Sequence, residues 1–376
     1  MNPETLDILM NIILIFSGLY ILCIGAFTFG IYNISSNENI RNDKTDKKVS
    51  ILIAAKNEEK SISKSLQSLV NQSFDKNNFE IIIVDDNSTD LTFEVVLEFI
   101  KRHPDLRIRL VKAEGCGKKQ AVAQALHLAE NEVIMVTDAD CELPPRWIEK
   151  TVGFMTANDL KMVLGPVLLS PCGTFFEKIQ VLEHLSLIAS TAGAAAIRMP
   201  VMCNGANMAY DRKSALEVEQ YRTDMNIASG DDIFLMERFS KHYGSRSIKF
   251  LMDEDAIVKT QSMPDLKSFF RQRRRWVSKT KVYTSWKIIV TALVVLMFNF
   301  SVFGLFAGGF FHPAFFLVYA LFVLMKFMVD YPILRKITDF MNRRELMKWA
   351  FPLEFVYPFY VVFTAFSGIF LKVKWK

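Results

Sequence analysis

Long apolar runs lie towards both ends of the chain, with a polar region between them. Residues 8–32 hold no charged side chain. A helix of about 25 residues rises ~1.5 Å per residue and can cross the ~30 Å hydrocarbon core of a membrane. Three further long apolar runs occupy residues 288–311, 313–334 and 351–371. The pattern predicts four transmembrane helices.

The first run is interpreted as a retained anchor. It begins near Glu4 and Asp7, whereas a secretory signal peptide begins with basic residues. Four basic residues follow it: Arg41, Lys44, Lys47 and Lys48. Because basic residues favour the cytoplasmic side, the next domain is expected in the cytoplasm and the N-terminus outside. A second basic segment at 335–348 predicts another cytoplasmic loop, although the basic end "KVKWK" would then lie outside, against the same rule.

Two of the C-terminal runs carry polar residues. Lys326 and Asp330 stand four positions apart, so a helix brings them together and an ion pair lowers the cost of placing charge near lipid. The pair could serve a function or only neutralise the two charges. Pro352, Glu354 and Pro358 interrupt the last run. They predict that this span is broken or re-entrant.

The polar region alternates between strand and helix patterns. Continuous apolar segments predict buried strands at 49–55, 79–86, 107–113 and 131–140. Helical spacing predicts helices at 62–70, 91–102 and 118–129. Such alternation predicts an α/β fold with a mostly parallel sheet, whose ligands bind beyond the carboxyl ends of the strands. The expected domains are an anchor and linker at 1–45, an α/β domain at 46–286, and a C-terminal transmembrane region of about three spans at 287–376.

Composition supports a membrane protein. The chain has 376 residues, of which 51% are hydrophobic, and its formal net charge is +5. Because the basic residues gather beside apolar segments, they favour an anionic membrane surface over nucleic acid, for which no recognised binding module is present. The five cysteines show no metal-binding spacing and are odd in number, which favours a reducing cytosol.

Acidic residues follow two of the predicted strands. Asp85 and Asp86 end one strand, and Asp138 and Asp140 end another. Residues two apart in extended backbone point to the same face, so Asp138 and Asp140 repel each other unless a cation lies between them. Mg²⁺ or Mn²⁺ on a substrate diphosphate would satisfy both carboxylates. Ordinary turn chemistry is the alternative for such acids.

Other polar residues point to the same edge of the sheet. Asn57 and Glu58 follow the first strand, and Lys118 starts a helix, where the dipole and amide groups favour a phosphate. Asp231 and Asp232 precede a later helix, where they could simply be helix-start charges. Helix capping explains a single acid of this kind more easily than it explains several acids at one edge of the sheet.

These motifs resemble those of family 2 glycosyltransferases. "DDNSTD", "DAD", "GDD" and "QRRRW" occur in the family's order and approximate spacing. The resemblance is to the membrane-embedded branch, which includes cellulose, chitin, hyaluronan and poly-N-acetylglucosamine synthases. It covers residues 49–286 and, more loosely, the flanking spans. It implies a GT-A-like nucleotide-sugar-binding domain and inverting transfer of a sugar from a nucleoside diphosphate donor.

The resemblance also implies roles for single residues. Asn57, Glu58 and Asp86 would line the nucleoside pocket, with Lys118 near it. Asp138 would contact the nucleotide.

For the chemistry, the resemblance implies that Asp140 holds the metal on the diphosphate and that Asp232 is the general base. The family more often has Glu before that base, so Asp231 departs from its pattern. "CNGANMAY" matches the acceptor-side segment, with Asn204 and Asn207 as candidates.

The segment "FFRQRRRWVSKT" combines arginines with a tryptophan before an apolar run. In a helix, Gln272, Arg275 and Trp276 share one face. The resemblance makes that face the family's "QxxRW" signature, which closes over the diphosphate and the acceptor end. Arg273 and Arg274 point elsewhere and are expected to meet anionic headgroups. A plain juxtamembrane basic patch is the alternative.

Residues 175–197 carry few charges, which fits either an amphipathic interfacial helix or an ordinary core helix.

The expected function is therefore a membrane-bound, metal-dependent glycosyltransferase. Its partners would be a nucleoside diphosphate sugar, a UDP-sugar by preference, membrane lipids, and a lipid-linked or polysaccharide acceptor, with no nucleic acid. A polyprenyl-phosphate sugar synthase is an alternative, which is disfavoured because those relatives generally lack "QxxRW". A catalytically silent membrane scaffold is a second alternative, against which the intact acids argue.

Overall fold

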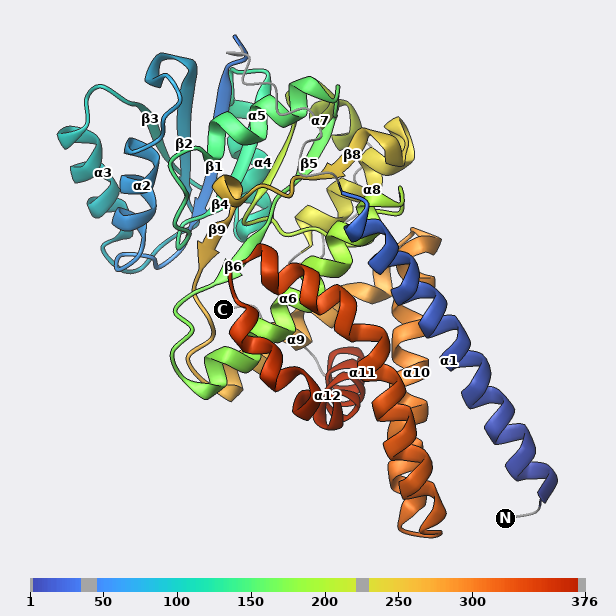
Figure 1. Ribbon diagram of the computed structural model, residues 1–376. Coiled ribbons are helices and arrows are strands. Elements are labelled where there is room, and N and C mark those ends of the chain that lie inside the picture. Colours follow the sequence, from blue (N-terminus) through green and yellow to red (C-terminus); the bar gives the residue numbers. More distant parts are fainter. Residues whose placement is uncertain (1–2, 35–45, 221–229, 371–376) are drawn as a thin grey trace. The chain divides into compact units, whose positions relative to one another are not determined.

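The computed structural model describes residues 3–34, 46–220 and 230–370 (Figure 1). The basic residues predicted at 41 and 44 and the end "KVKWK" lie outside the described residues, as does the side chain of Asp231. The chain forms two compact units. The α/β unit comprises Ile34–Cys172 and Arg198–Ser262, and the helical unit comprises Met1–Asn33, Gly173–Ile197 and Met263–Lys376.

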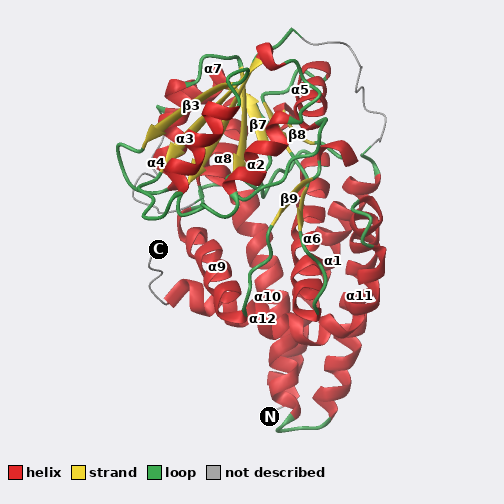
Figure 2. Ribbon diagram, turned by 90° about the vertical axis from the view of Figure 1, so that its left-hand side faces the viewer, coloured by secondary structure: helices red, strands yellow, loops and turns green. Residues whose placement is uncertain are grey.

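The α/β unit is built on a seven-stranded sheet with the order β3-β2-β1-β4-β7-β5-β8 (Figure 2). Its strands are β1 (Val49–Ala55), β2 (Phe79–Asp85), β3 (Arg107–Lys112), β4 (Val133–Asp138), β5 (Met162–Leu164), β7 (Met208–Asp211) and β8 (Ile248–Phe250). Strands β1 to β4 are parallel, and β7 runs antiparallel to both β4 and β5. The parallel order brings the carboxyl ends of β1, β2 and β4 to one edge, as expected for a doubly wound sheet.

Burial explains why the first strands form the centre. β2 is buried at all seven positions, and β1 at six of seven, which is the pattern of a parallel strand covered on both faces. The helices of the unit are α2 (Ile62–Val70), α3 (Thr92–Arg102), α4 (Lys118–Leu128), α5 (Trp147–Ala157), α7 (Arg212–Glu219) and α8 (Asp231–Tyr243). Short 3-10 helices lie at Lys76–Asn78, Ser245–Ser247 and Glu254–Ala256. The four predicted strands and three predicted helices of this region are confirmed.

A second, two-stranded sheet pairs β6 (Val167–Leu169) with β9 (Val258–Thr260). These strands are three residues long, which is too short for a periodic pattern to show in the sequence. The ladder matters for the site because β9 ends with Thr260, and Glu142 just after β4 bridges to Lys259. It therefore ties the β9 segment to the loop that carries Asp140.

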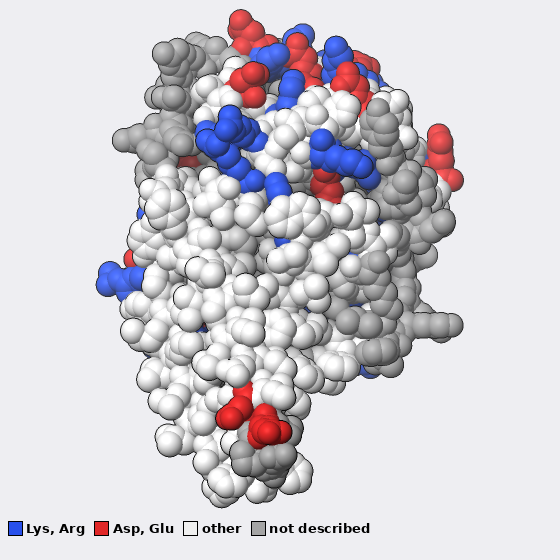
Figure 3. Space-filling model, turned by 90° about the vertical axis from the view of Figure 1, so that its right-hand side faces the viewer, with Lys and Arg blue, Asp and Glu red and all other residues white. Residues whose placement is uncertain are grey.

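The helical unit contains α1 (Pro3–Tyr32), α6 (Phe175–Ala196), α9 (Leu266–Ser278), α10 (Trp286–Gly309), α11 (Ala314–Phe340) and α12 (Ala350–Phe370). Short 3-10 helices lie at Lys279–Val282 and Arg344–Trp349. Four described helices are long and apolar enough to cross a membrane. Figure 3 shows a broad face over helices of this unit that is nearly free of charged side chains. Exposed apolar residues such as Leu22 and Phe29 suit contact with lipid, and together these features indicate membrane association.

Helices α1 and α6 cross at a pair of glycines. A Cβ atom on Gly193 would lie 2.2 Å from the carbonyl oxygen of Phe27, and one on Gly30 would lie 2.2 Å from that of Gly193. Small residues allow such close backbone approach between membrane helices. The segment 175–197 therefore packs closely against α1 within the helical unit.

The last predicted span differs from the expectation. Helix α12 runs unbroken from Ala350 to Phe370 with Pro358 inside it, so the predicted break is wrong. The predicted pair of Lys326 and Asp330 is confirmed at 2.5 Å. Lys326 also pairs with Glu354 at 2.6 Å, so a third charged residue satisfies this buried cluster.

Candidate active site

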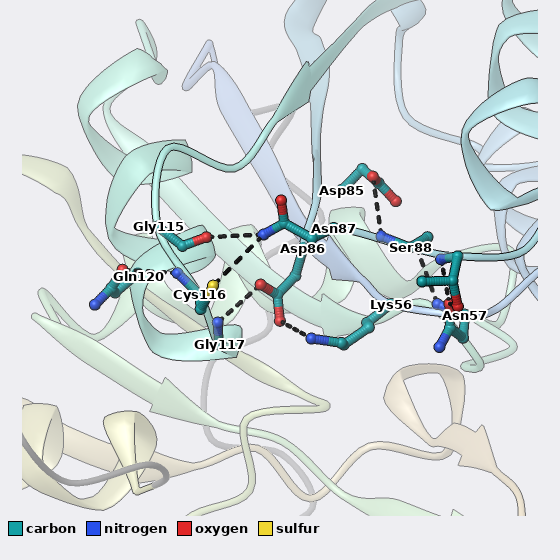
Figure 4. Close-up of polar contacts among 11 residues, drawn as sticks. Lys56, Asn57, Asp85, Asp86, Asn87, Ser88, Gly115, Cys116, Gly117 and Gln120 are labelled. Carbon is teal, nitrogen blue, oxygen red and sulfur yellow. Dashed lines mark hydrogen bonds and ion pairs between the residues drawn. The ribbon is translucent and has the colours of Figure 1, made fainter. Parts of the chain in front are cut away.

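Asp86 lies at the carboxyl end of β2 and is 2% exposed. Its Oδ1 accepts a hydrogen bond from the backbone N–H of Gly117 at 2.8 Å, and its Oδ2 lies 3.4 Å from Nζ of Lys56 (Figure 4). Asp86 thereby joins the ends of β1 and β2 to the start of α4. Gly117 has φ = +99°, a conformation that glycine tolerates and that aims its amide at the carboxylate.

Two loops at this edge are locked together by side chains. Oδ1 of Asn57 accepts from the backbone N–H of Thr89 at 2.7 Å, and the N–H of Asn57 donates to Oγ of Ser88 at 3.0 Å (Figure 4). The N–H of Glu58 donates to Oγ1 of Thr92 at 2.7 Å. The loop after β1 is thus fixed against the loop after β2.

Glu58 is partly buried beside other acids. Burial raises the pKa of its carboxyl group, while a hydrogen bond from Ser61 lowers it, and the charges of Asp140 and Asp138 raise it again. These electrostatic interactions show that Glu58 faces the same cluster as the two "DAD" acids.

Asp138 and Asp140 follow β4 as predicted. Asp138 forms an ion pair with Nζ of Lys118, which the first turn of α4 presents. Burial raises the pKa of the Asp140 carboxyl, and the negative charge of Asp138 raises it further. Thr260 at the end of β9 donates a hydrogen bond to Oδ2 of Asp140 at 3.0 Å. Asp140 is therefore partly buried, oriented by Thr260, and close to a like charge.

The donor set fits a hard divalent cation. Within the described ranges, no three or more acids, histidines or cysteines are arranged so that they could hold a metal ion together. Asp138 and Asp140 supply carboxylate oxygens, the ligands that Mg²⁺ and Mn²⁺ prefer, and a cation would relieve the repulsion that raises the pKa of Asp140. Such a cation would need further oxygens from outside the protein, as Mg²⁺ commonly takes from substrate phosphates.

Asp232 reaches the same cluster from the first turn of α8. Its Oδ2 accepts a hydrogen bond from the backbone N–H of Gly205 at 3.2 Å. A Cβ atom on Gly205 would lie 3.6 Å from both Oδ2 of Asp232 and Nζ of Lys118. Lys118, which pairs with Asp138, and Asp232 therefore both lie beside Gly205.

The two asparagines of the "CNGANMAY" segment differ in role. Oδ1 of Asn204 accepts from the N–H of Ala206 at 3.0 Å and shapes the turn that carries Gly205. Asn207 is 2% exposed, accepts from Nε1 of Trp147 at 2.9 Å, and donates to the backbone carbonyls of two other residues. These bonds use both N–H groups of its amide and hold Asn207 inside the α/β unit.

The remaining predicted residues belong to α9 of the helical unit. Gln272, Arg275 and Trp276 lie on this helix as expected. Arg273 does not meet lipid headgroups as predicted, because it is 4% exposed and paired with Glu183 of α6. Sequence reasoning missed this partner, which is ninety positions away.

Three contributors to the site were also missed. Lys56, Thr260 and Gly205 each contact one of the predicted acids. Lys56 stands directly before Asn57, so its place after β1 was a usable signal. Thr260 and Gly205 come from segments whose register the sequence does not reveal.

Residues 50–219 match the sequence model described as "Glycosyl transferase family 2". The match covers 170 of the 376 residues. Among the similar proteins is the beta-monoglucosyldiacylglycerol synthase of Nostoc sp., which is 42% identical over 97 residues, 25% of this chain and 20% of that protein. The poly-beta-1,6-N-acetyl-D-glucosamine synthase of Staphylococcus epidermidis is 26% identical over 67% of this chain and 60% of that one.

A solved structure shares the fold of this chain. The mannosyltransferase from Pyrobaculum calidifontis, in complex with GDP-Man and Mn²⁺, is 16% identical, and the match covers 92% of this chain and 98% of that one with a TM-score of 0.60. At that identity the likeness shows the fold, a GT-A-like α/β domain. The chain spans about a fifth of the length of the glucosyldiacylglycerol synthases that it matches.

Proposed function

We propose that the chain is a membrane-anchored inverting glycosyltransferase that moves a sugar from a nucleoside diphosphate donor, preferably a UDP-sugar. The acceptor is a hydroxyl of a lipid-linked sugar or a polysaccharide at the cytoplasmic face of the membrane. The observation that carries the proposal is that Lys118 pairs with Asp138, close to Asp140, and lies with Asp232 beside Gly205. These acids belong to a unit in which residues 50–219 match the glycosyl transferase family 2 model.

The nucleoside side of the donor is assigned to the locked loops. Asn57, Glu58 and Asp86 lie at the carboxyl ends of β1 and β2, where ligands of doubly wound sheets bind. Their hydrogen bonds to neighbouring loops hold them in place before the donor arrives. A site held in this way loses little conformational entropy when it binds.

The diphosphate is assigned to the start of α4 and to the acids after β4. Lys118 and the amide groups of the first helical turn favour a phosphate, and Asp138 orients the lysine. Asp140 is the proposed ligand for Mg²⁺ or Mn²⁺. The metal, when bound, would stabilise the negative charge that develops on the leaving diphosphate.

Asp232 is the proposed general base. A sugar hydroxyl is a weak nucleophile, so a carboxylate that takes its proton as the oxygen attacks C1 typically accelerates the step by about 10² to 10⁴ fold. The new bond forms between the acceptor oxygen and C1, and the bond from C1 to the diphosphate oxygen breaks with its electron pair. Attack from the face opposite the leaving group inverts the anomeric configuration. Backbone N–H groups orient the Asp232 carboxylate, that of Gly205 at Oδ2 and that of Ile233 at Oδ1.

The acceptor and the membrane are assigned to the other unit. Gln272, Arg275 and Trp276 are proposed to bind the diphosphate and the acceptor end, because a guanidinium meets phosphate bidentately and an indole stacks on a sugar ring. Asn204 is proposed on the acceptor side. The names of the relatives, a glucosyldiacylglycerol synthase and a polysaccharide synthase, support a lipid or polysaccharide acceptor.

A screen of donors tests the proposal. The full chain is purified in detergent, returned to vesicles with membrane lipid extract, and incubated with Mn²⁺ and radiolabelled nucleotide sugars. The proposal predicts label in the lipid or polymer fraction with one of them. Transfer to a polyprenyl phosphate itself would favour the polyprenyl-phosphate sugar synthase. The absence of both donor binding and donor hydrolysis would favour the silent scaffold.

A further inference from the structure

Arg273 is the most buried of the arginines in the "QRRRW" segment. Its guanidinium makes a two-pronged contact with Glu183 of α6, with Nε donating to Oε1 at 3.1 Å and Nη2 paired with Oε2. Both side chains are about 95% buried, at 5% and 6% exposure. A bidentate pair of this kind fixes direction as well as distance.

The same carboxylate binds α12. The hydroxyl of Tyr360 donates to Oε1 of Glu183 at 2.9 Å. The Tyr360 ring lies 5.8 Å from that of Phe269 on α9. Glu183 therefore ties three helices, α6, α9 and α12, at one point.

Arg273 in turn contacts the two ends of the signature. Its Nη1 donates to Oε1 of Gln272 at 2.6 Å, and its guanidinium carbon lies 4.2 Å from the ring centre of Trp276. A second ring, that of Phe269, lies 4.6 Å away on the same helix. The guanidinium is thus held between two aromatic rings and a carboxylate, while it orients Gln272 and Trp276.

We propose that Glu183, Arg273 and Tyr360 are positioning residues, which hold α9 so that Gln272 and Trp276 are presented in one geometry. The inference rests on the proposed function, in which those two residues bind the donor diphosphate and the acceptor. A buried ion pair contributes little net stability compared with apolar packing, but it can specify a single arrangement. The three residues link the membrane helix α12 to the signature helix.

The main experiment compares Glu183→Gln with Tyr360→Phe in the full-length protein. Hydrogen exchange of residues 266–278 reports the order of α9, and the transfer assay reports kcat and the donor KM. Glu183→Gln should raise amide exchange in α9 and lower kcat by about 10² fold, the size that follows from a misplacement near 1 Å. Tyr360→Phe keeps the ring and removes one hydrogen bond, so its loss in kcat should be about 3- to 10-fold.

Glu354→Gln is the matched control. It also removes a buried carboxylate that pairs with a cation, but its partner Lys326 lies on α11. It should destabilise the protein as Glu183→Gln does while leaving α9 exchange and kcat within about twofold of wild type. If the control and Glu183→Gln lower kcat alike, the role of the network is only structural and the proposal is overturned.

Hydrogen exchange tests this inference, and the transfer assay tests the proposed function separately. Unchanged α9 exchange in both Glu183→Gln and Tyr360→Phe would overturn the network, whatever the activity. A wild-type chain that transfers no sugar would count against the proposed function, and the exchange arm would still decide whether the network orders α9. If Glu183→Gln does not fold, Tyr360→Phe carries the test.

Discussion

Single side chains set the chemistry that the α/β unit can perform. Asp232 and Asp140 have different surroundings: the first accepts backbone hydrogen bonds from Gly205 and Ile233, and the second is partly buried next to Asp138. The proposed roles differ accordingly, with Asp232 as proton acceptor and Asp140 as metal ligand. The two residues should therefore fail in different ways when they are changed.

Asp232→Asn should remove transfer and leave donor binding intact. The amide cannot take the acceptor proton, so kcat should fall by about 10² to 10⁴ fold. The measurement is single-turnover transfer alongside equilibrium binding of the nucleotide sugar. Residual transfer combined with lost donor binding would contradict the assignment of Asp232 as base.

Glu58 gives a prediction about pH. Because its pKa is raised in the folded chain, mainly by burial, the folded state keeps the proton at pH values where the unfolded state has lost it. The stability it contributes is present below its unfolded pKa, about 4.3, and is lost as pH rises through the folded value. The Tm of wild type should thus fall relative to that of Glu58→Gln as the pH rises above about 4.3. A Tm difference that stays constant as the pH rises would show that Glu58 does not titrate as described.

At this scale the sequence revealed residue types but not their neighbours. Asp86, Asp138 and Asp140 could be placed because they end strongly apolar strands, whose carboxyl ends meet. Asn207 and Arg273 could not, because their partners come from other segments. The same asparagine can face a ligand or satisfy a buried indole, and only the packing decides between them.

The helices and strands determine the positions of those side chains. The long apolar strands β1 to β4 and helices α2 to α4 could be predicted because their periodicity extends over several turns or pleats. β5, β6, β8 and β9 are three residues each, and their pairing depends on contacts between distant segments. Pro358 suggested a break in α12, but packing against neighbouring helices keeps that helix continuous.

The crossing of α1 and α6 can be tested at one glycine. Gly193→Ala would place a Cβ atom 2.2 Å from the carbonyl oxygen of Phe27, so the backbones must separate. Overpacking of this kind costs about 1–3 kcal/mol, which should appear as a lower Tm in detergent. Gly25→Ala on α1 is the control, since a Cβ there meets nothing within 4 Å. Equal Tm values for the two variants would rule out a close crossing at Gly193.

On the scale of the whole molecule, the proposal requires the α/β unit to face the cytoplasm. Cys116 lies in this unit and is exposed, and His312 lies exposed between α10 and α11. A membrane-impermeant maleimide should label Cys116 in inside-out vesicles only, with Cys116→Ser as the background. His312→Cys should be labelled at position 312 in right-side-out vesicles only. Labelling of Cys116 in right-side-out vesicles, together with labelling of position 312 in inside-out vesicles, would show that the topology is the reverse of the predicted one.

The charge pattern predicted this orientation, but it could not predict the division into two compact units. Residues 175–197 and 263–286 belong to the helical unit, although the sequence grouped them with the α/β domain. Their modest hydrophobicity resembles that of an ordinary core helix. Contacts such as the glycine crossing, which depend on three-dimensional packing, decide the grouping.

The most direct test of the account is equilibrium binding of a nucleotide sugar to the purified chain, with and without Mn²⁺. The account predicts metal-dependent binding to wild type and to Asp232→Asn, and loss of the metal-dependent part in Asp140→Ala. Binding that is the same in Asp140→Ala as in wild type, with the same dependence on Mn²⁺, would contradict the claim that these acids form one site for a metal and a sugar nucleotide.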